Sequence, residues 1–407
     1  MVTERDDRAR PIIATALLVL LFLSILLMWI PGRWALSLFQ VGVFALAIFW
    51  TLRAKHFVGG FALYPLAGAV LLGLTQLALG RTIYRWETLN AVLTWTTQLA
   101  CFFLGLQILS PQRIRDRFLQ AVFYFGFALS VISTVQLFTS EGAVFWIFPS
   151  GYKELVLGPF VYHNQFAAFV ELVFPLAVVA ALRHRARSLI YAGMAAALYA
   201  SVIASVSRAG AALVTLELVA ILAIAWARRQ ISRRTAGLVT ICFVAFVACF
   251  VAVVGWQTLL DRLRRPDLYE SRREMLWSSL DMIRERPGMG FGLGTWATAY
   301  PAYAYADDGL FANQAHNDWA QWAAEGGLPL FFMMLSIAIW SVRPAVNSLW
   351  GVGIVAIFLH CLVDYPIQRP ALGGFFFVLL GALAAQANES VPPKKHLDFV
   401  NETYTNS

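Results

Sequence analysis

Charged residues are scarce in this chain. Asp, Glu, Lys and Arg make up 13% of its 407 residues, and hydrophobic residues make up 59%. A soluble globular protein is roughly 25% charged. Apolar runs near the ~20 residues needed to cross a bilayer recur from end to end. This composition excludes a soluble protein and predicts an all-α polytopic membrane protein.

Cysteine is also scarce, and no CxxC pair occurs. The four cysteines all lie inside apolar runs, at Cys101, Cys242, Cys249 and Cys361. This placement argues against a disulfide framework and against a zinc site. We therefore expect four small core residues and no metal.

Basic residues outnumber acidic ones by 31 to 23, which gives a net charge of +8. They form short clusters between the apolar runs, where basic residues set the orientation of a membrane protein. The positive charge therefore does not indicate nucleic-acid binding.

The hydropathy pattern predicts about twelve transmembrane helices. The first begins after Arg10 and has no small-residue cleavage site, so we expect it to be retained rather than removed as a signal peptide. The predicted spans are 11–31, 34–52, 57–79, 88–109, 118–139, 165–182, 188–206, 210–227, 236–258, 326–342, 348–365 and 371–387.

Lysine and arginine are distributed unequally between the two sides of these spans. With the N-terminus in the cytoplasm, eighteen lie on the cytoplasmic side and six in short outward loops, at Arg33, Arg81, Arg85, Lys153, Arg208 and Arg369. This asymmetry obeys the positive-inside rule and predicts that both termini are cytoplasmic.

The predicted chain has five parts. Residues 1–157 hold five spans and a first large outward loop, 158–258 hold spans six to nine, 259–325 form a long outward loop, 326–387 hold the last three spans, and 388–407 form a cytoplasmic tail. Long loops within a compact fold usually carry function. We expect the catalytic loop, with short amphipathic helices, at 259–325.

A helix in this loop is predicted to begin at Ser271, because Ser271 and Glu274 have the spacing of a capping box. Arg272 and Arg273 would oppose the helix dipole, so local stability does not explain them. With free helical amides they form a candidate anion site. The spacing to Trp277 points Arg273 toward the membrane body and Arg272 away from it. Contact with lipid headgroups is the alternative.

Arg208 stands in the sequence Ser207-Arg208-Ala209-Gly210, between two predicted spans. An arginine at full membrane depth would cost roughly 3 kcal/mol or more. Its small neighbours leave room for a ligand, which favours a cation aimed into a cavity. The alternative is a side chain that reaches back to the interface.

His316 is the candidate general base, since histidine titrates near neutral pH. It precedes a predicted short helix that ends at the membrane, at Gly326-Gly327. No second ligand stands at i+3 or i+4, which disfavours a metal pair. A structural hydrogen bond is the alternative role for His316.

Four further ionisable residues fall within predicted spans. Glu171 and Glu217 lie in mid-span, and we expect at least one of them to pair with an arginine. His360 and Asp364 share a face at i, i+4, and we expect His360 to make a hydrogen bond between helices.

Glycines at positions 288, 290, 292 and 294 are spaced like a nucleotide-binding loop. No strand precedes them, so we predict a tight turn instead.

Five stretches follow one another in a specific order along the chain. They are GPFVYHNQFAAFVELVFPLA (158–177), SVSRAG (205–210), SRREMLWSSLDMIRERPGMGFGLGTW (271–296), AHNDWAQWAAEGGLPLF (315–331) and HCLVDYPIQRPAL (360–372). With twelve spans and one large outward loop, this order resembles the O-antigen ligase and polymerase-related family of bacterial membrane glycosyltransferases. The first five spans match only in being hydrophobic.

The resemblance implies a metal-independent transferase of the GT-C type in the bacterial inner membrane, with no cofactor and an active site that faces the periplasm. The implied donor is a glycan on undecaprenyl diphosphate, and the implied acceptor is a hydroxyl of lipid A core or of another glycan. Membrane lipids surround the protein, and no nucleic acid is involved.

Residue roles follow from the same resemblance. Arg208 and Arg273 match the arginines expected to hold the donor diphosphate, and Arg272 lies beside them. His316 matches the residue proposed to activate the acceptor, and Asn317 follows it as in the family. The chemistry agrees, because a leaving diphosphate is stabilised by positive charge and an acceptor hydroxyl by a base.

The chain departs from the family at Tyr162-His163-Asn164, where family members often have two asparagines spaced by one residue. The resemblance therefore assigns no role to Tyr162, whereas Asn164 remains a polar contact at the cavity mouth. Asp364 matches a recurrent aspartate with a supporting role. We count Glu171 and Glu217 as further supporting residues.

Three alternative functions compete with this one: a polymerase, a transporter or flippase, and a structural scaffold. A ligase and a polymerase differ in acceptor but not in donor chemistry, and the family name favours the ligase. A proton-coupled transporter or flippase would use Glu171 and Glu217, but the two halves of the chain show no repeat. A structural scaffold leaves Arg208, Arg273 and His316 unexplained.

Overall fold

The computed structural model describes residues 4–151, 156–231, 269–305 and 311–389, with a few single positions between 237 and 252 and at 309. The regular secondary structure of this part is helical apart from one short hairpin, formed by β1 (Ala143–Val144) and β2 (Phe148–Pro149). The all-α class is confirmed.

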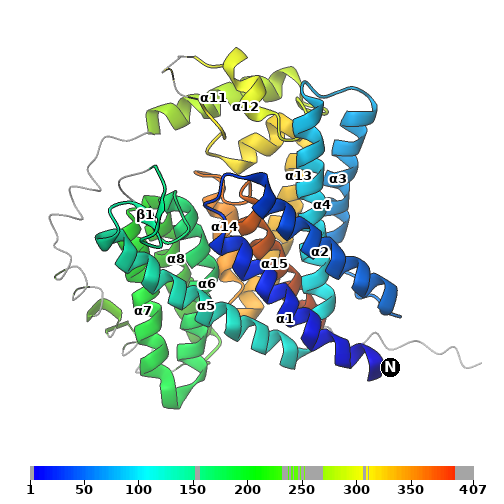
Figure 1. Ribbon diagram of the computed structural model, residues 1–407. Coiled ribbons are helices and arrows are strands. Elements are labelled where there is room, and N and C mark those ends of the chain that lie inside the picture. The colour runs from blue at the N-terminus through cyan, green and yellow to red at the C-terminus, as the bar shows by residue number, and fades with distance from the viewer. Residues whose placement is uncertain are drawn as a thin grey trace, which may run out of the picture.

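The helices form an elongated bundle, capped at one end by two helices of the polar loop (Figure 1). Their bounds are α1 (Glu4–Leu26), α2 (Arg33–Arg53), α3 (Leu63–Ala78), α4 (Arg85–Ile108), α5 (Gln112–Thr139), α6 (His163–Arg183), α7 (Ser188–Ser205), α8 (Arg208–Ala227), α11 (Tyr269–Glu285), α12 (Trp296–Ala299), α13 (Asp318–Ser348), α14 (Val352–His360) and α15 (Pro370–Glu389). Two 3-10 turns cover Arg185–Arg187 and Tyr300–Ala302.

Nine of the described helices are long and apolar enough to cross a membrane, and α3, with 16 residues, is a shorter apolar helix. The predicted count of twelve is therefore not confirmed. Most of the predicted span 236–258, all of residues 259–268, the tail from 390 onward, and Cys242 and Cys249 lie outside the described residues. Cys101 and Cys361 are buried and free, as expected.

The predicted eleventh span, 348–365, is wrong as a single membrane-crossing helix. α14 contains 9 residues, which rise about 14 Å against a hydrocarbon core of about 30 Å. The chain then forms an irregular loop, residues 361–369. Asp318, the first residue of α13, holds part of the loop backbone: the Asp318 amide donates to Cys361 O at 2.9 Å, and the Ile367 amide donates to the Asp318 carboxylate at 3.1 Å.

The predicted loop helix and the predicted tenth span are one element, α13, with a kink at Gly327. Gly327 has φ 68° and ψ −173°, and the backbone of Pro287 and Gly288 lies where a side chain would be. Only glycine fits there without strain. The short helix thus ends at the double glycine, as the sequence predicts.

α6 and α15 form the centre of the bundle, with most of their residues buried. α15 packs closely on α4, because Gly105 and Gly381 have no side chain to keep the two backbones apart. α6 contacts α5, α7, α8 and α14. This centre carries the residues that reach the site.

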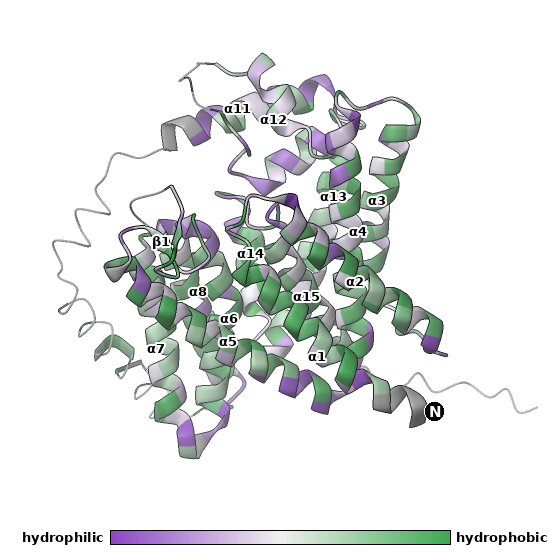
Figure 2. Cartoon of the chain, in the orientation of Figure 1, coloured by the Kyte–Doolittle hydropathy of each residue, from purple (hydrophilic) through white to green (hydrophobic). Residues whose placement is uncertain are grey.

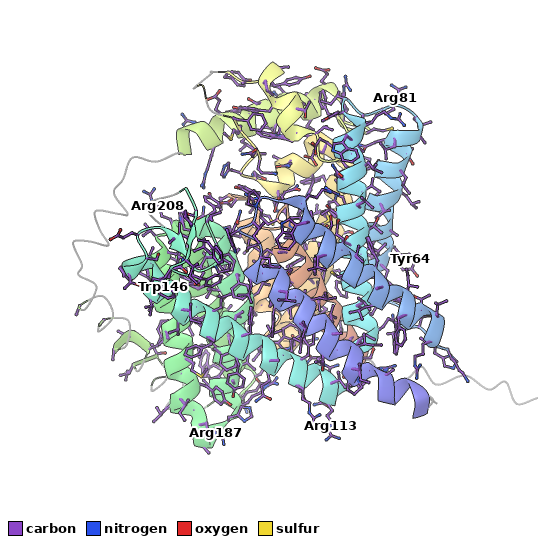
Figure 3. The ribbon with its side chains drawn as sticks, viewed as in Figure 1. Tyr64, Arg81, Arg113, Trp146, Arg187 and Arg208 are labelled. Carbon is purple, nitrogen blue, oxygen red and sulfur yellow. The ribbon has the colours of Figure 1, made fainter. Side chains whose placement is uncertain are left out.

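Hydrophobic residues cover the bundle, and hydrophilic ones gather on α11, α12 and the helix ends (Figure 2). Figure 3 shows Arg113 and Arg187 at the lower end of the bundle, Arg81 at the upper end, and Arg208 at the left side above Trp146. Arg113 and Arg187 thus lie at the opposite end from Arg81, as their predicted membrane faces require. The direction in which each end faces stays a prediction.

Candidate active site

The predicted helix start at Ser271 is wrong, because α11 already includes Tyr269 and Glu270. Ser271 is thus inside the helix and cannot cap it. Arg272 and Arg273 still lie near the N-terminal end of the described helix, so their charges oppose the helix dipole as predicted. The predicted capping box is absent, because Ser271 is not the N-cap.

The two arginines of α11 point in the opposite sense from the prediction. Arg272 turns toward the bundle, with its side chain 17% exposed, and its Nη2 donates to the Tyr162 hydroxyl at 2.8 Å. Arg273 is exposed, and so is Trp277, which shares its face. The apolar character of Trp277 suggested that this face was buried. Polar partners on the bundle orient the helix instead.

The Tyr162 hydroxyl joins three other side chains in one partly buried network. It accepts from Arg272 and from Asn164 Nδ2, the latter at 2.9 Å, and it donates to Asp364 Oδ2 at 3.0 Å. Asn164 also donates to Asp364 Oδ2. The phenol thus accepts twice and donates once, which satisfies it fully. Asn164 is buried here and does not lie at a cavity mouth as expected.

Two pKa shifts follow from this network. Burial alone would raise the pKa of Asp364, but the neighbouring His316, His360 and Arg272 outweigh it and lower the pKa to about 2. Burial, reinforced by the Asp364 charge, raises the pKa of Tyr162 well above its ordinary value. Asp364 is therefore an anion and Tyr162 a neutral donor near neutral pH.

His316 lies between this network and the outside of the bundle. Its Nδ1 is 3.7 Å from Asp364 Oδ1, and this buried atom has no hydrogen bond among the described residues. The ring meets Tyr365 edge-on, with centroids 4.8 Å apart, and the side chain is 24% exposed. Its backbone has φ 49°, a conformation that non-glycine residues rarely adopt.

The neighbours of His316 hold its backbone in place. Asn317 caps α13 by accepting from the Ala320 amide at 3.0 Å, and it donates to Leu362 O at 2.7 Å. On the other side, the Ala315 amide donates to Gln321 Oε1 at 3.0 Å. These contacts offset the cost of a positive φ and keep the ring beside Asp364.

A cleft of about 400 Å³ opens in front of these residues. Its lining combines two guanidinium groups, an imidazole and an amide with apolar side chains: Arg272, Arg273, Leu276, His316, Asn317, Leu362 and Val363. Such a cleft can hold an anion beside a proton acceptor. The predicted residues Arg272, Arg273, His316 and Asn317 thus come together in one place.

Arg208 does not belong to the described residues that line the cleft. It is the first residue of α8 and is exposed, and Ser207 caps the helix by accepting from the Gly210 amide at 3.1 Å. Figure 3 shows Arg208 at the end of the bundle nearer to α11.

Neither mid-span glutamate makes a described ion pair with an arginine, so that prediction is wrong. Glu171 pairs with His360, whose Nδ1 lies 2.8 Å from Glu171 Oε1. Both carboxylate oxygens of Glu217 lack a described partner. The predicted hydrogen bond of His360 between helices is confirmed.

Sequence reasoning missed Tyr162, Tyr365 and Asp318. The resemblance assigned no role to Tyr162, but its hydroxyl bridges Arg272 and Asp364. Asp318 follows Asn317 directly and is fully buried, which its polarity did not suggest. The glycine turn is confirmed, since Gly290, Gly292 and Gly294 all have positive φ.

The fold and the site thus define a multi-pass membrane protein with a charged cleft at one end of its bundle. A family model described as O-antigen ligase matches residues 192–335. The match covers about a third of the chain, includes Arg208, Arg272, Arg273 and His316, and shows that this segment is similar to the O-antigen ligase family. It supports a glycosyltransferase role in polysaccharide assembly. No curated protein matches the chain.

Proposed function

We propose that the protein transfers a glycan from undecaprenyl diphosphate to an acceptor hydroxyl on the periplasmic face of the bacterial inner membrane. The observation that carries this proposal is the shared cleft of Arg272, Arg273 and His316, which lies within the matched segment. Positive charge for a diphosphate and a base for a hydroxyl are the two requirements of such a transfer.

In the proposed reaction the acceptor oxygen attacks the anomeric carbon of the donor glycan. The new carbon–oxygen bond forms as the bond from that carbon to the diphosphate breaks. His316 takes the acceptor proton, and undecaprenyl diphosphate leaves with the bonding electrons. Asp364 supports the imidazolium so formed, because its carboxylate lies 3.7 Å from Nδ1.

Arg273 is proposed to contact the donor diphosphate directly, since it is exposed at the cleft. Arg272 lines the same cleft but is fixed by Tyr162, which orients it in advance. Arg208 is proposed as a further diphosphate contact. These cations supply the charge stabilisation that a metal would otherwise provide, so we expect a chelator to leave the transfer rate unchanged.

A ligase is the more specific proposal, with lipid A core as acceptor. Purified protein is incubated with the undecaprenyl diphosphate-linked glycan, with and without lipid A core, and transfer is read by gel mobility. Transfer that requires core supports a ligase. A ladder of polymers without core identifies a polymerase, and counterflow exchange without transfer identifies a transporter.

A further inference from the structure

A second cavity, of about 610 Å³, is distinct from the cleft of His316. It lies where the turn between α1 and α2 meets the first residues of α15, and the β1–β2 hairpin covers it through Pro149 and Ser150. Trp29, in that turn, stacks on Phe148 of the hairpin with centroids 4.9 Å apart. The cavity lies entirely outside the segment matched by the family model.

Two arginines line this cavity and no acidic residue does. Arg33 and Arg369 are both exposed, and neither forms an ion pair with a described carboxylate. They are two of the six basic residues on the predicted outward side, where the positive-inside rule disfavours them. Orientation in the membrane therefore does not explain these two charges.

Local helix stability does not explain them either. Arg33 is the first residue of α2, and Arg369 directly precedes α15. A cation at a helix N-terminus opposes the dipole, and neither first turn contains an acidic residue to compensate. Two helix ends and two guanidinium groups thus converge on one cavity. This arrangement favours an anion such as a phosphate.

The other residues that line the cavity are mostly apolar, which favours a lipid as the ligand. Leu27, Met28, Leu36, Phe39 and Val161 supply an apolar lining, and Trp34 and Leu38, at the start of α2, are more than half exposed. A guanidinium pair at the edge of an apolar cavity fits a phosphate with a hydrocarbon chain. A free sugar or a free phosphate would leave the apolar walls uncovered.

Tyr365 contacts one lining residue of the active cleft and one lining residue of the cavity. The Tyr365 ring lies beside the His316 ring, with the two centroids 4.8 Å apart. On another side Arg369 lies over the ring, with Cζ 5.5 Å from its centroid. A lipid phosphate at Arg369 would therefore lie one aromatic ring away from the proposed base.

We propose that this cavity, bounded by Arg33 and Arg369, binds the phosphate of the acceptor lipid. The inference rests on the proposed function, because the acceptor is defined by that reaction. The donor diphosphate would lie in the cleft of Arg272 and Arg273, and the acceptor phosphate would lie beyond Tyr365. His316 stands between the two.

The test measures acceptor binding without turnover, in the His316→Ala protein in nanodiscs and without donor. The probes are lipid A core with its phosphates and the same molecule after dephosphorylation. We expect the phosphorylated probe to bind on the order of tenfold more tightly, as expected for charge-assisted hydrogen bonds. Arg33→Gln with Arg369→Gln should abolish that difference and leave donor affinity unchanged.

The matched control is Arg81→Gln with Arg85→Gln, which removes two charges from the same predicted face outside the cavity. An equal loss in the control would show a general charge effect and overturn the proposal. Equal binding of both probes, or competition by phosphatidylglycerol as strong as by acceptor, would also overturn it. Because binding is read without donor, a failure of transfer would refute the proposed function and leave this result standing.

Discussion

Two histidine–carboxylate pairs lie within the described part of the chain, and they differ most in their access to solvent. His360 and Glu171 approach to 2.8 Å between α14 and α6, and both side chains are fully buried. His316 and Asp364 are 3.7 Å apart, and the His316 side chain is 24% exposed at a cleft with two arginines. The tighter pair holds helices together, and the looser pair can meet a substrate. A short distance between a histidine and a carboxylate therefore does not by itself indicate a catalytic role. Catalytic hydrogen bonds are often long before the substrate binds.

The largest effect on the transfer rate is expected from a substitution of His316, in the more accessible of the two pairs. His316→Ala should reduce transfer about 10²–10⁴-fold, the usual contribution of a general base, and should leave donor binding intact. Initial rates and donor affinity measured on the same preparation test this. His56→Ala, at an exposed histidine away from the cleft, is the matched control. Donor affinity falling in parallel with rate would show that His316 binds rather than reacts.

Asp364→Asn should have the next largest effect, roughly tenfold or more on turnover, because the supporting charge is lost while the shape is kept. The pKa of about 2 for Asp364 lies below the ordinary aspartate value. Its ionised form therefore stabilises the fold above pH ~4, and this contribution disappears as the pH falls toward 2. The difference in melting temperature between wild type and Asp364→Asn should narrow over the same range. A constant difference would contradict the assigned ionisation.

The arginines should affect binding rather than turnover. Arg273→Ala and Arg208→Ala should each weaken donor affinity about tenfold, as expected for the loss of a charge-assisted contact. Titration of the His316→Ala protein with lipid-linked glycan measures this without reaction. Arg284→Ala, exposed at the far end of α11, serves as the control. If all three variants lost affinity equally, the assignment of roles would fail.

Sequence reasoning predicted most of the fold because apolar runs of bilayer length have one stable solution in lipid. It failed at α14, where the irregular loop 361–369 replaces the end of a span. Hydropathy cannot show that Asp318 supplies the hydrogen bonds such a loop needs. Periodicity likewise oriented α11 by its apolar residues, whereas the hydrogen bond from Arg272 to Tyr162 turns it the other way. Contacts between residues distant in the chain determine both the loop after α14 and the orientation of α11.

The smallest effect on turnover is expected at the buried pair. His360→Ala leaves the Glu171 carboxylate buried without a partner, which should cost about 3 kcal/mol or more of stability. Glu171→Gln keeps a hydrogen-bonding group opposite His360 and should cost less. Melting temperature and the rate per folded molecule separate these effects, since a structural pair lowers the first and leaves the second near wild type. A turnover loss in folded His360→Ala as large as that of His316→Ala would show that both pairs take part in catalysis. The distinction between a structural and a catalytic pair would then be wrong.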